Sequence, residues 1–386
     1  MKLLHTADWH IGKQLNGFDL LEEQWHAFTQ IREIAKMEKV DGIIIAGDLF
    51  DRAIPSVSAV KALNEMFYLL NMEDGFPIYA VSGNHDSAQR LQFGGEWFER
   101  QHLHLATTIA DALKPIETDT TQVFLLPFFD PIDARIYFEK EPDEIRTIND
   151  AMPLVINEMT TQFHPEKHQL LVTHFHVQGE GNEAYELTSE TTSTVGGLSA
   201  VAASHFQLFD YVALGHLHLY QASPNHKMRY SGSPVKFNTK EAKNQKGVYI
   251  VELDGELTTR FIPIQPKKDL IVLKGTYEEL CSSEFYTQQP AKGSAFFSIK
   301  LTNRPLDQNP RQRLSEIYGD IVELHYLLEK TSGDMEIQHM RKRTALNEEE
   351  MIATFYKEMT GQPLSDRQQE WTEEMLISLR KEGGQS

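Results

Sequence analysis

Five short apolar segments within the first 220 residues each run directly into a polar residue of a metal-binding type. The segments are residues 3–7, 42–46, 78–82, 170–173 and 211–214. Apolar runs of this length, bounded by Gly, Asp or His, predict buried strands. Because binding sites of α/β sheets gather beyond the carboxyl ends of the strands, we expect one edge of a sheet to collect the polar side chains that follow these segments.

The polar residues at these strand ends are aspartates, an asparagine and histidines. In chain order they are Asp8, His10, Asp48, Asn84, His85, Asp86, His174, His176, His216 and His218. A single Asp-x-His is more often a turn with a satisfied core histidine, whereas five such segments together favour a site. His216 and His218 follow the last of these segments directly after Gly215, a residue that supports a turn at that point.

The residue types of this set indicate which ions it would bind. The chain has 16 histidines but a single cysteine, Cys281, which excludes all-cysteine zinc sites and an internal disulfide framework. Two carboxylates, one amide oxygen and four imidazoles suit manganese, iron or zinc. Seven ligands are too many for one ion and fit two. Two ions roughly 3.5–4 Å apart can clamp the attacking and leaving oxygens of an in-line displacement at phosphorus.

Strand and helix patterns alternate over residues 1–265 and predict an α/β core. Helices are expected near 20–35 and 57–70, and a sixth strand at 248–253. A break containing two prolines at 262–266 separates this part from a small α+β unit. We therefore expect a first domain over 1–265 and a capping domain over 266–335. The capping domain should have strands at 270–273, 295–301 and 321–328 and a helix at 310–318.

Residues 336–386 are expected to form a polar linker and a helical hairpin. Asn347 and Glu350 have the spacing of a capping box at the start of the first helix. The apolar faces of the hairpin are candidates for binding a partner protein. The candidate contact residues are Phe355, Tyr356, Trp371 and Leu376. Packing of the hairpin on its own chain is the alternative, and spacing alone does not separate the two.

The strand-end motifs resemble those of a known superfamily. Asp8-x-His10, Gly47-Asp48-x-x-Asp51, Gly83-Asn84-His85-Asp86, His174 and Gly215-His216-x-His218 resemble the calcineurin-like metallophosphoesterase signature. Residues 6–12 and 47–51 are similar to the SbcD family, the nuclease subunit of the SbcCD DNA-repair complex. The resemblance covers the whole chain. It implies an α/β fold, a two-sheet metallophosphoesterase sandwich flanked by helices, with a small α+β capping domain and a C-terminal helical hairpin.

The resemblance also implies a role for each strand-end residue. Asp8, His10 and His218 would hold one metal ion, and Asn84, His174 and His216 the other, with Asp48 as the bridge. His85 would lie over the scissile phosphate as general acid or charge stabiliser, oriented by Asp86. Asp51 would support the site from outside the ligand set, with a helix-entry role as the alternative. His176 lies near the site in the sequence but is not among the ligands that the resemblance implies.

The implied activity is that of a DNA nuclease that uses two divalent metal ions, Mn²⁺ being the expected ion. It would act as a 3′–5′ exonuclease on duplex ends and an endonuclease on hairpins and single strands, by in-line attack of hydroxide made available by the metals. The chain has no P-loop motif. The resemblance implies an SbcC-type coiled-coil ATPase as partner, docked on the hairpin, and a homodimer within a heterotetramer. The complex would serve DNA repair, recombination and replication.

The charge of the chain is unevenly distributed. The 37 Lys+Arg and 56 Asp+Glu give a net charge of −19, which alone argues against nucleic-acid binding. Residues 227–246, however, carry six bases and one acid. We expect this stretch to lie on the rim of the metal site and to contact DNA phosphates through Arg229, Lys236 and Lys240. A solvated loop is the alternative. The overall acidity predicts weak DNA affinity for the isolated chain.

Two other functions are compatible with these motifs. A phosphatase or a phosphodiesterase for small substrates would use the same metal site, and a non-catalytic assembly subunit would keep the fold without using it. The single cysteine fits a reducing compartment. The first residues contain too short an apolar run for a signal peptide, and no segment reaches the about 18 apolar residues of a membrane span. We therefore expect a cytoplasmic protein.

Overall fold

A computed structural model describes most of the chain up to residue 327 and short pieces beyond it. The described residues are 1–141, 143–179, 200–305, 309–327, 352–353, 356–357, 364–365, 367–369, 371–372 and 375. The contacts divide the chain into two compact units. The first contains residues 1–274, 278–300 and 307–325, and the second contains most of the C-terminal part.

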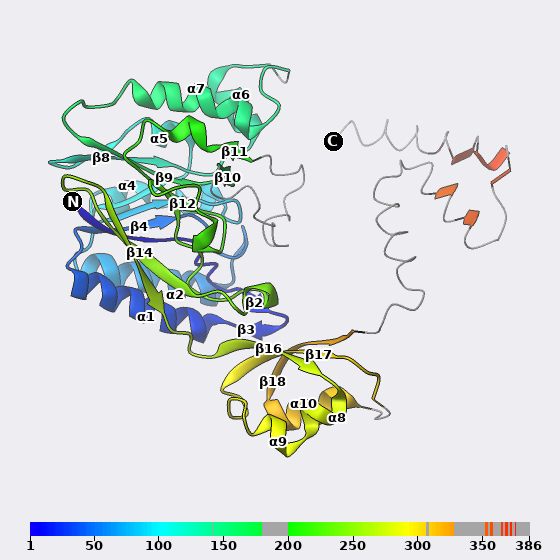
Figure 1. Cartoon of the computed structure of the whole chain (residues 1–386). Coiled ribbons are helices and arrows are strands. Elements are labelled where there is room, and N and C mark those ends of the chain that lie inside the picture. The colour runs from blue at the N-terminus through cyan, green and yellow to red at the C-terminus, as the bar shows by residue number, and fades with distance from the viewer. Residues whose placement is uncertain are drawn as a thin grey trace. The chain divides into compact units, whose positions relative to one another are not determined.

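The first unit is built around two β-sheets (Figure 1). The larger sheet has six strands in the order β15-β14-β1-β4-β5-β6. These are β15 Thr258–Ile264, β14 Lys246–Glu252, β1 Lys2–Thr6, β4 Gly42–Ala46, β5 Ile78–Val81 and β6 Leu103–Ala106. Strands β1, β4, β5 and β6 run parallel, and β14 pairs antiparallel with both β1 and β15.

The second sheet has five strands in the order β13-β12-β9-β8-β7. These are β13 Met228–Tyr230, β12 Tyr211–Gly215, β9 His168–His174, β8 Thr121–Leu126 and β7 Ile116–Glu117. All neighbours pair in parallel except β7, which is antiparallel to β8. The six strands expected in the core are therefore confirmed, and they divide between two sheets.

The two sheets pack face to face through alternate side chains of their strands. Ile44 and Val81 of the larger sheet share a buried cluster with Val123 and Val172 of the smaller one. Because side chains alternate along a strand, Ile43 and Ile45 point the other way, into the layer beneath the helices. The apolar patterns of the strands thus produce the two-sheet sandwich that the resemblance implies.

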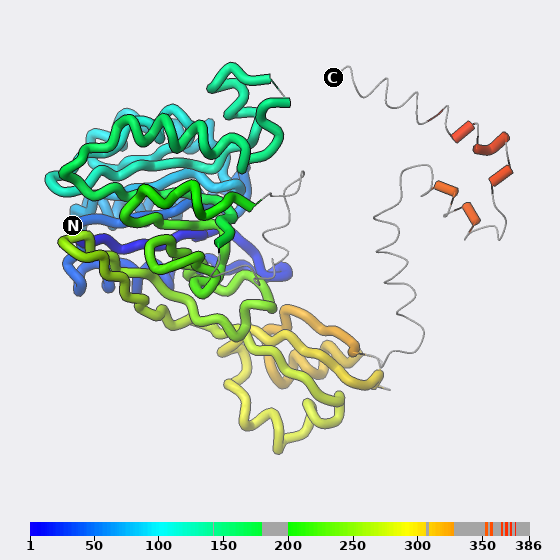
Figure 2. Tube along the Cα trace, turned by 45° about the horizontal axis from the view of Figure 1, so that its top comes forward, coloured from blue at the N-terminus to red at the C-terminus, as the bar shows by residue number. Residues whose placement is uncertain are grey.

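Helices cover both outer faces of the sandwich (Figures 1 and 2). Helices α1 Leu21–Glu38 and α2 Val57–Phe67 pack on the larger sheet, and α6 Pro131–Phe138 and α7 Ile148–Thr160 pack on the smaller one. The Ser56 side chain accepts a hydrogen bond from the Ala59 N–H at 3.2 Å and so caps α2. The apolar pattern expected to end near residue 70 continues from α2 as a π-helical turn, Tyr68–Glu73.

Shorter elements connect these layers. They are β2 Gln14–Leu15, β3 Phe18–Asp19, α3 Ala88–Leu91, α4 Gly95–Glu99, α5 Ile109–Ala112, β10 Val177–Gln178 and β11 Val201–Ala202. Turns of the 3₁₀ type span Ala203–Phe206, Tyr220–Ala222 and Thr239–Glu241. The last of these turns lies in the basic stretch 227–246 and follows the strand β13.

A separate three-stranded sheet follows the sandwich, in the order β16-β17-β18. Its elements are β16 Asp269–Gly275, α8 Tyr277–Cys281, α9 Ser283–Tyr286, β17 Ala295–Leu301, α10 Pro310–Tyr318 and β18 Asp320–Tyr326. The three strands and the helix Pro310–Tyr318 were expected from the sequence, whereas the short α8 and α9 were not. Leu270, Phe296 and Val322 of this part share a buried cluster with Leu15 and Leu20 of the first part. The domain boundaries themselves remain a prediction.

Only pieces of the expected hairpin are described. Phe355 and Leu376 lie outside the described residues. Tyr356 accepts a hydrogen bond from the Gln368 side chain at 3.0 Å, and the Arg367 guanidinium lies 5.0 Å from the centre of the Trp371 ring. No helix in the described part of the chain is both long enough and apolar enough to cross a membrane.

Candidate metal centre

The five strand ends meet where the carboxyl edges of the two sheets adjoin. Strands β1, β4 and β5 bring three of the motifs from the larger sheet, and β9 and β12 bring two from the smaller one. The His174 Nδ1–H donates to the Ala46 carbonyl at 2.8 Å and joins the two edges. A Cβ on Gly215 would lie 1.7 Å from that same carbonyl oxygen. The glycine before His216 is therefore required for the close approach of the sheets.

Four ligand candidates have backbone conformations that side chains rarely adopt. Asp8, His10, Asp48 and His216 have φ values of 54°, 44°, 50° and 100°. Such conformations cost of order 1–3 kcal/mol each and persist where the surroundings hold them. Backbone hydrogen bonds from Asp8 N to Gly47 O at 3.0 Å and from His10 N to Asp48 O at 2.9 Å fix the first two loops together. The loops are thus held in shapes that aim their side chains inward.

Two side chains clamp these loops, and one of them was not expected. Buried Gln24 of α1 donates to the carbonyls of Trp9 and His10 and accepts from Gly12 N–H. The Asp86 carboxylate accepts from the backbone N–H groups of Leu49, Phe50 and Gly83 at 2.9–3.0 Å. Burial and the charge of Asp48 raise the pKa of Asp86 to about 7, against the effect of these hydrogen bonds.

The predicted ligand side chains converge into two overlapping groups. Ligand atoms of Asp8, His10 and His218 lie within 4.8 Å of one another, and so do those of Asp8, Asp48 and His174. The His10 and His218 Nε2 atoms are 3.1 Å apart. Asp48 Oδ2 lies 3.5 Å from His10 Nε2 and 3.2 Å from His174 Nε2, so this carboxylate reaches both groups.

Asn84 and His216 complete the second group. Asn84 Oδ1 lies 3.1 Å from both His174 Nε2 and His216 Nδ1. Because His174 uses its Nδ1–H on a carbonyl, Nε2 is the ring atom that faces Asn84 Oδ1 and Asp48 Oδ2. Burial would lower the pKa of His174, but Asp48 raises it to about 9. Acceptor atoms facing one another in this way need either an extra proton or a cation between them.

Buried polar atoms without hydrogen-bond partners among the described residues favour a bound cation at this centre. Asp8 Oδ2, His10 Nδ1 and His216 Nε2 are buried and have no hydrogen-bond partner among the described residues. An unsatisfied buried polar atom costs about 1–3 kcal/mol, and more when it is charged. Burial raises the pKa of Asp8, although His174 and His218 oppose this. The carboxylate, amide and imidazole donors therefore fit divalent metal ions of the manganese, iron or zinc type.

His85 has a different partner from the one expected. Its Nδ1 lies 2.9 Å from the Asp51 backbone carbonyl, which fixes a proton on Nδ1 and leaves Nε2 for proton exchange. Its backbone N–H donates to Asp48 Oδ1 at 2.9 Å, and its ring centre is 4.8 Å from that of His10. The expectation that Asp86 orients His85 is corrected, because the Asp86 carboxylate is occupied by backbone amides.

Asp51 supports the site from outside the ligand set. Its carboxylate accepts from Lys13 Nζ at 2.7 Å, and its backbone carbonyl holds His85. His176, which is close in sequence to His174, has a buried Nδ1 without a partner in the part of the chain that is described.

A buried ion pair behind His218 was also missed by sequence reasoning. His218 Nδ1 lies 3.1 Å from Glu241 Oε1, and Glu241 pairs with Lys246. Burial would raise the pKa of Glu241, but Lys246 and His218 hold it at about 2. Both charged residues were counted in the basic stretch, and nothing in their spacing distinguishes them from its solvated members.

Two of the three residues expected to contact DNA have contacts within the protein. Lys236 donates to Asp269 at 2.7 Å and to the Ala242 carbonyl, so its charge is used within the protein. Arg229 lies 5.7 Å from the centre of the Tyr249 ring and has a buried Nε. Lys240 is exposed and directly precedes Glu241. Of the three expected DNA contacts, Lys240 is the exposed one.

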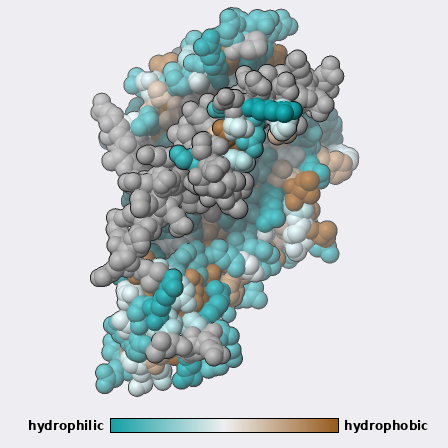
Figure 3. Space-filling model, turned by 90° about the vertical axis from the view of Figure 1, so that its right-hand side faces the viewer, coloured by the Kyte–Doolittle hydropathy of each residue, from teal (hydrophilic) through white to brown (hydrophobic). Residues whose placement is uncertain are grey.

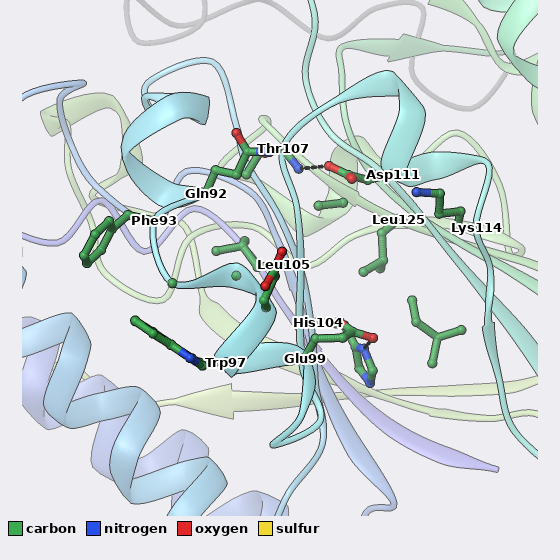
Figure 4. A pocket seen from close by; sticks show the side chains of 15 residues that line it. Gln92, Phe93, Trp97, Glu99, His104, Leu105, Thr107, Asp111, Lys114 and Leu125 are labelled. Atoms are coloured by element: carbon green, nitrogen blue, oxygen red, sulfur yellow. Dashed lines mark hydrogen bonds and ion pairs between the residues drawn. The ribbon is translucent and has the colours of Figure 1, made fainter.

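A cavity of about 730 Å³ lies apart from the metal centre (Figure 4). It is lined by Phe93, Trp97, His104 and Lys114, among other residues, around strand β6. Figure 4 shows the Trp97 and Phe93 rings on the same side of this cavity. Among the coloured atoms of Figure 3, hydrophilic side chains predominate, with small apolar groups between them. No ligand candidate of the two metal groups lines the cavity.

The sandwich and its acceptor-lined centre define a calcineurin-like phosphoesterase, and that family's model matches residues 1–220. A second model, described as the Type 5 capsule protein repressor C-terminal domain, matches residues 266–360. Two curated relatives are each named as the SbcD component of the nuclease SbcCD. The Staphylococcus epidermidis protein is 33% identical over 99% of this chain and 100% of its own length. The Staphylococcus saprophyticus protein is 31% identical over 99% of this chain and 100% of its own length. The chain belongs to the SbcD family.

Proposed function

We propose that this chain is the metal-dependent DNA nuclease of an SbcCD-type complex. The observation that carries the proposal is the convergence of seven ligand candidates whose acceptor atoms face one another. The names of the two relatives supply the nuclease activity and the complex. Exonuclease action from 3′ to 5′ on duplex ends and endonuclease action on hairpins and single strands are the activities we propose for it.

Each ligand candidate has a proposed place. Asp8, His10 and His218 would hold the first ion, and Asn84, His174 and His216 would hold the second. Asp48 would be shared by the two, which is supported by the reach of its Oδ2 to a histidine of each group. We propose Mn²⁺ as the working ion because the mixed oxygen and imidazole donors suit it.

Two bound ions would supply a nucleophile at neutral pH and a clamp on the reacting phosphate. The protein's own contribution is to hold the ligand side chains in fixed positions and to exchange a proton. His85 Nε2 is the atom that exchanges it, because Nδ1 is held by the Asp51 carbonyl. From this position His85 stabilises the charge on the phosphate or protonates the leaving oxygen. The Asp86 carboxylate holds the backbone of the loop that follows β4 and does not orient the His85 imidazole.

The substrate class is tested by comparing two substrates in the presence of Mn²⁺. The purified chain with its ATPase partner should cut duplex DNA far faster than a small phosphodiester such as bis-p-nitrophenyl phosphate. Cleavage of the small substrate alone would assign the chain to the phosphodiesterases for small molecules instead. Loss of both activities with chelator, and their return with Mn²⁺, would show that the same centre is responsible.

Lys240→Glu should weaken DNA binding without affecting Mn²⁺ binding. The side chain is exposed, and the next residue contacts the metal-site histidine His218. Reversing one charge near a phosphate should lower affinity several-fold at low salt and reduce the salt slope by about 1–2. Fluorescence anisotropy over a salt series measures both. The matched control is Arg100→Glu, an equal charge change at an exposed residue that ends α4. Equal effects of the two variants would show that Lys240 makes no specific contact.

The partner is proposed to be an SbcC-type coiled-coil ATPase bound to the C-terminal hairpin. Trp371 is 57% exposed, which leaves its ring available to a partner. Tyr356, and by sequence Phe355 and Leu376, would contribute to the same surface. Co-purification with the ATPase should be lost when the chain is truncated after Thr344. A truncated chain that still co-purifies would move the contact to another part of the protein.

We also propose a homodimer within a heterotetramer. Val57 on α2 and Phe93 and Trp97 near α4 are 74%, 81% and 72% exposed. Both regions pack on the same apolar cluster through Leu63 and Leu91, so they belong to one layer of the sandwich. Exposed apolar side chains of this size favour a surface that is covered in an assembly. The single cysteine agrees with a cytoplasmic location.

A further inference from the structure

The ion pair behind His218 lies in a segment that contacts the first metal group. Glu241 ends the 3₁₀ turn Thr239–Glu241, and its side chain is 1% exposed. Its Oε1 accepts from His218 Nδ1–H at 3.1 Å, while Oε2 pairs with Lys246 Nζ. The carboxylate is therefore shared between a metal-site histidine and a buried ammonium.

Lys246 holds the same histidine by its backbone. Its Nζ donates to the His218 carbonyl at 2.8 Å and to Ser233 Oγ at 2.7 Å. His218 is thus fixed at the ring by Glu241 and at the main chain by Lys246. The Phe237 ring comes from the same segment and packs edge-on against the rings of His10 and His218. The distances between ring centres are 5.3 and 5.6 Å.

Stability alone does not account for this pair. Burying two charges is costly, and apolar residues of similar volume often serve the fold as well or better. A carboxylate that accepts the second N–H of a metal-binding histidine, by contrast, fixes the tautomer and raises the basicity of the ligand atom. The lone pair of His218 is thereby directed from Nε2 towards His10, 3.1 Å away.

We propose that Glu241 and Lys246 are positioning residues that make the first metal site the tighter of the two. The inference rests on the proposed two-metal function. The asymmetry comes from the partners of the histidines. His218 donates to a carboxylate, whereas His174 of the second group donates to the neutral Ala46 carbonyl. A charged acceptor strengthens its ligand more than a neutral one does, so the first site fills before the second.

The test uses paired substitutions that leave no unpaired charge in the interior. Glu241→Leu with Lys246→Met removes the acceptor of His218, and Glu241→Gln with Lys246→Met keeps a neutral acceptor in the same place. The control is Glu117→Leu with Lys167→Met, an ion pair of 2.8 Å at the opposite end of β9. Circular dichroism and thermal unfolding with chelator establish that each full-length variant is folded.

Calorimetric titration of each protein with Mn²⁺ measures the affinity of each class of metal site. The wild type should show two classes of site. Glu241→Leu with Lys246→Met should lower the Mn²⁺ affinity of the tighter class about 10–100-fold and leave that of the weaker class unchanged. Glu241→Gln with Lys246→Met should lower the affinity of the tighter class less. The control pair should leave both classes unchanged. Should the Leu/Met pair not fold, a weakening by the Gln/Met pair confined to the tighter class still supports the inference.

Other results would overturn it. Unchanged affinities in the folded variants, or equal weakening of both classes, would give the pair a purely structural role. Single-turnover cleavage at saturating Mn²⁺ should recover in the Gln/Met variant to within a few-fold of the wild type, which a general loss of structure would prevent. A wild type that binds no Mn²⁺ would instead contradict the proposed function itself, so the two failures are distinguishable.

Discussion

Replacing Asp48 by asparagine is expected to lower Mn²⁺-dependent DNA cleavage roughly a thousandfold or more, which corresponds to about 4 kcal/mol of transition-state stabilisation. The side chain is buried, and its Oδ2 lies within 3.5 Å of histidine nitrogens from both metal groups. Asparagine has nearly the same shape and can still accept from the His85 N–H through its oxygen. The change therefore removes the charge that would be shared by two ions while leaving the loop intact.

The change in thermal stability on adding Mn²⁺ separates this effect from misfolding. Mn²⁺ raises the thermal stability of a protein that binds it only when folded, by an amount set by the ion concentration and its affinity. The wild type should gain stability with Mn²⁺, and Asp48→Asn should gain much less. Asp74→Asn is the matched comparison, because that carboxylate pairs with Arg32 and Lys36 and belongs to none of the candidate metal groups of the described residues. An Asp48→Asn protein with normal cleavage would remove the bridging role.

Replacing His85 by glutamine should lower the cleavage rate by about 10²–10⁴-fold and leave Mn²⁺ affinity unchanged. Glutamine can donate to the Asp51 carbonyl as His85 Nδ1 does, but it cannot exchange a proton. The loss should therefore fall on the rate of the chemical step and not on substrate affinity. Single-turnover cleavage at saturating Mn²⁺ measures it directly.

The control for His85 is His226→Gln. His226 is exposed in the loop before β13 and belongs to neither metal group. Its replacement should leave both cleavage and metal affinity at the wild-type values. A His85→Gln protein as active as His226→Gln would show that cleavage does not use this centre. A His85→Gln protein with weakened Mn²⁺ binding would instead make His85 a ligand.

The strands and the ligand residues could be predicted because their signals are local. Five apolar runs end in Asp, Asn or His, and each run became a strand that ends within two residues of the expected position. Periodicity alone did not show that the strands form two sheets, because pairing depends on long-range contacts. The resemblance to the metallophosphoesterases supplied that part of the fold.

The supporting residues were missed for the same reason. Gln24 reaches the first loop from α1, and Glu241 reaches His218 across 23 positions of the chain. Neither forms a local pattern. Asp86 follows His85 directly and was expected to orient it, but the turn directs the carboxylate to backbone amides of another loop. Lys236 is a basic residue of the kind that contacts DNA, but its ammonium group forms an ion pair with Asp269 of the same chain.

The central claim is that the seven ligand candidates hold two ions bridged by Asp48. Crystals of the chain grown with Mn²⁺ and measured at the manganese absorption edge test it most directly. We expect two anomalous peaks per chain, roughly 3.5–4 Å apart, on either side of the Asp48 carboxylate. One ion should lie next to His218 and the other next to His174. A single peak, or ions bound elsewhere on the chain, would contradict the two-ion site.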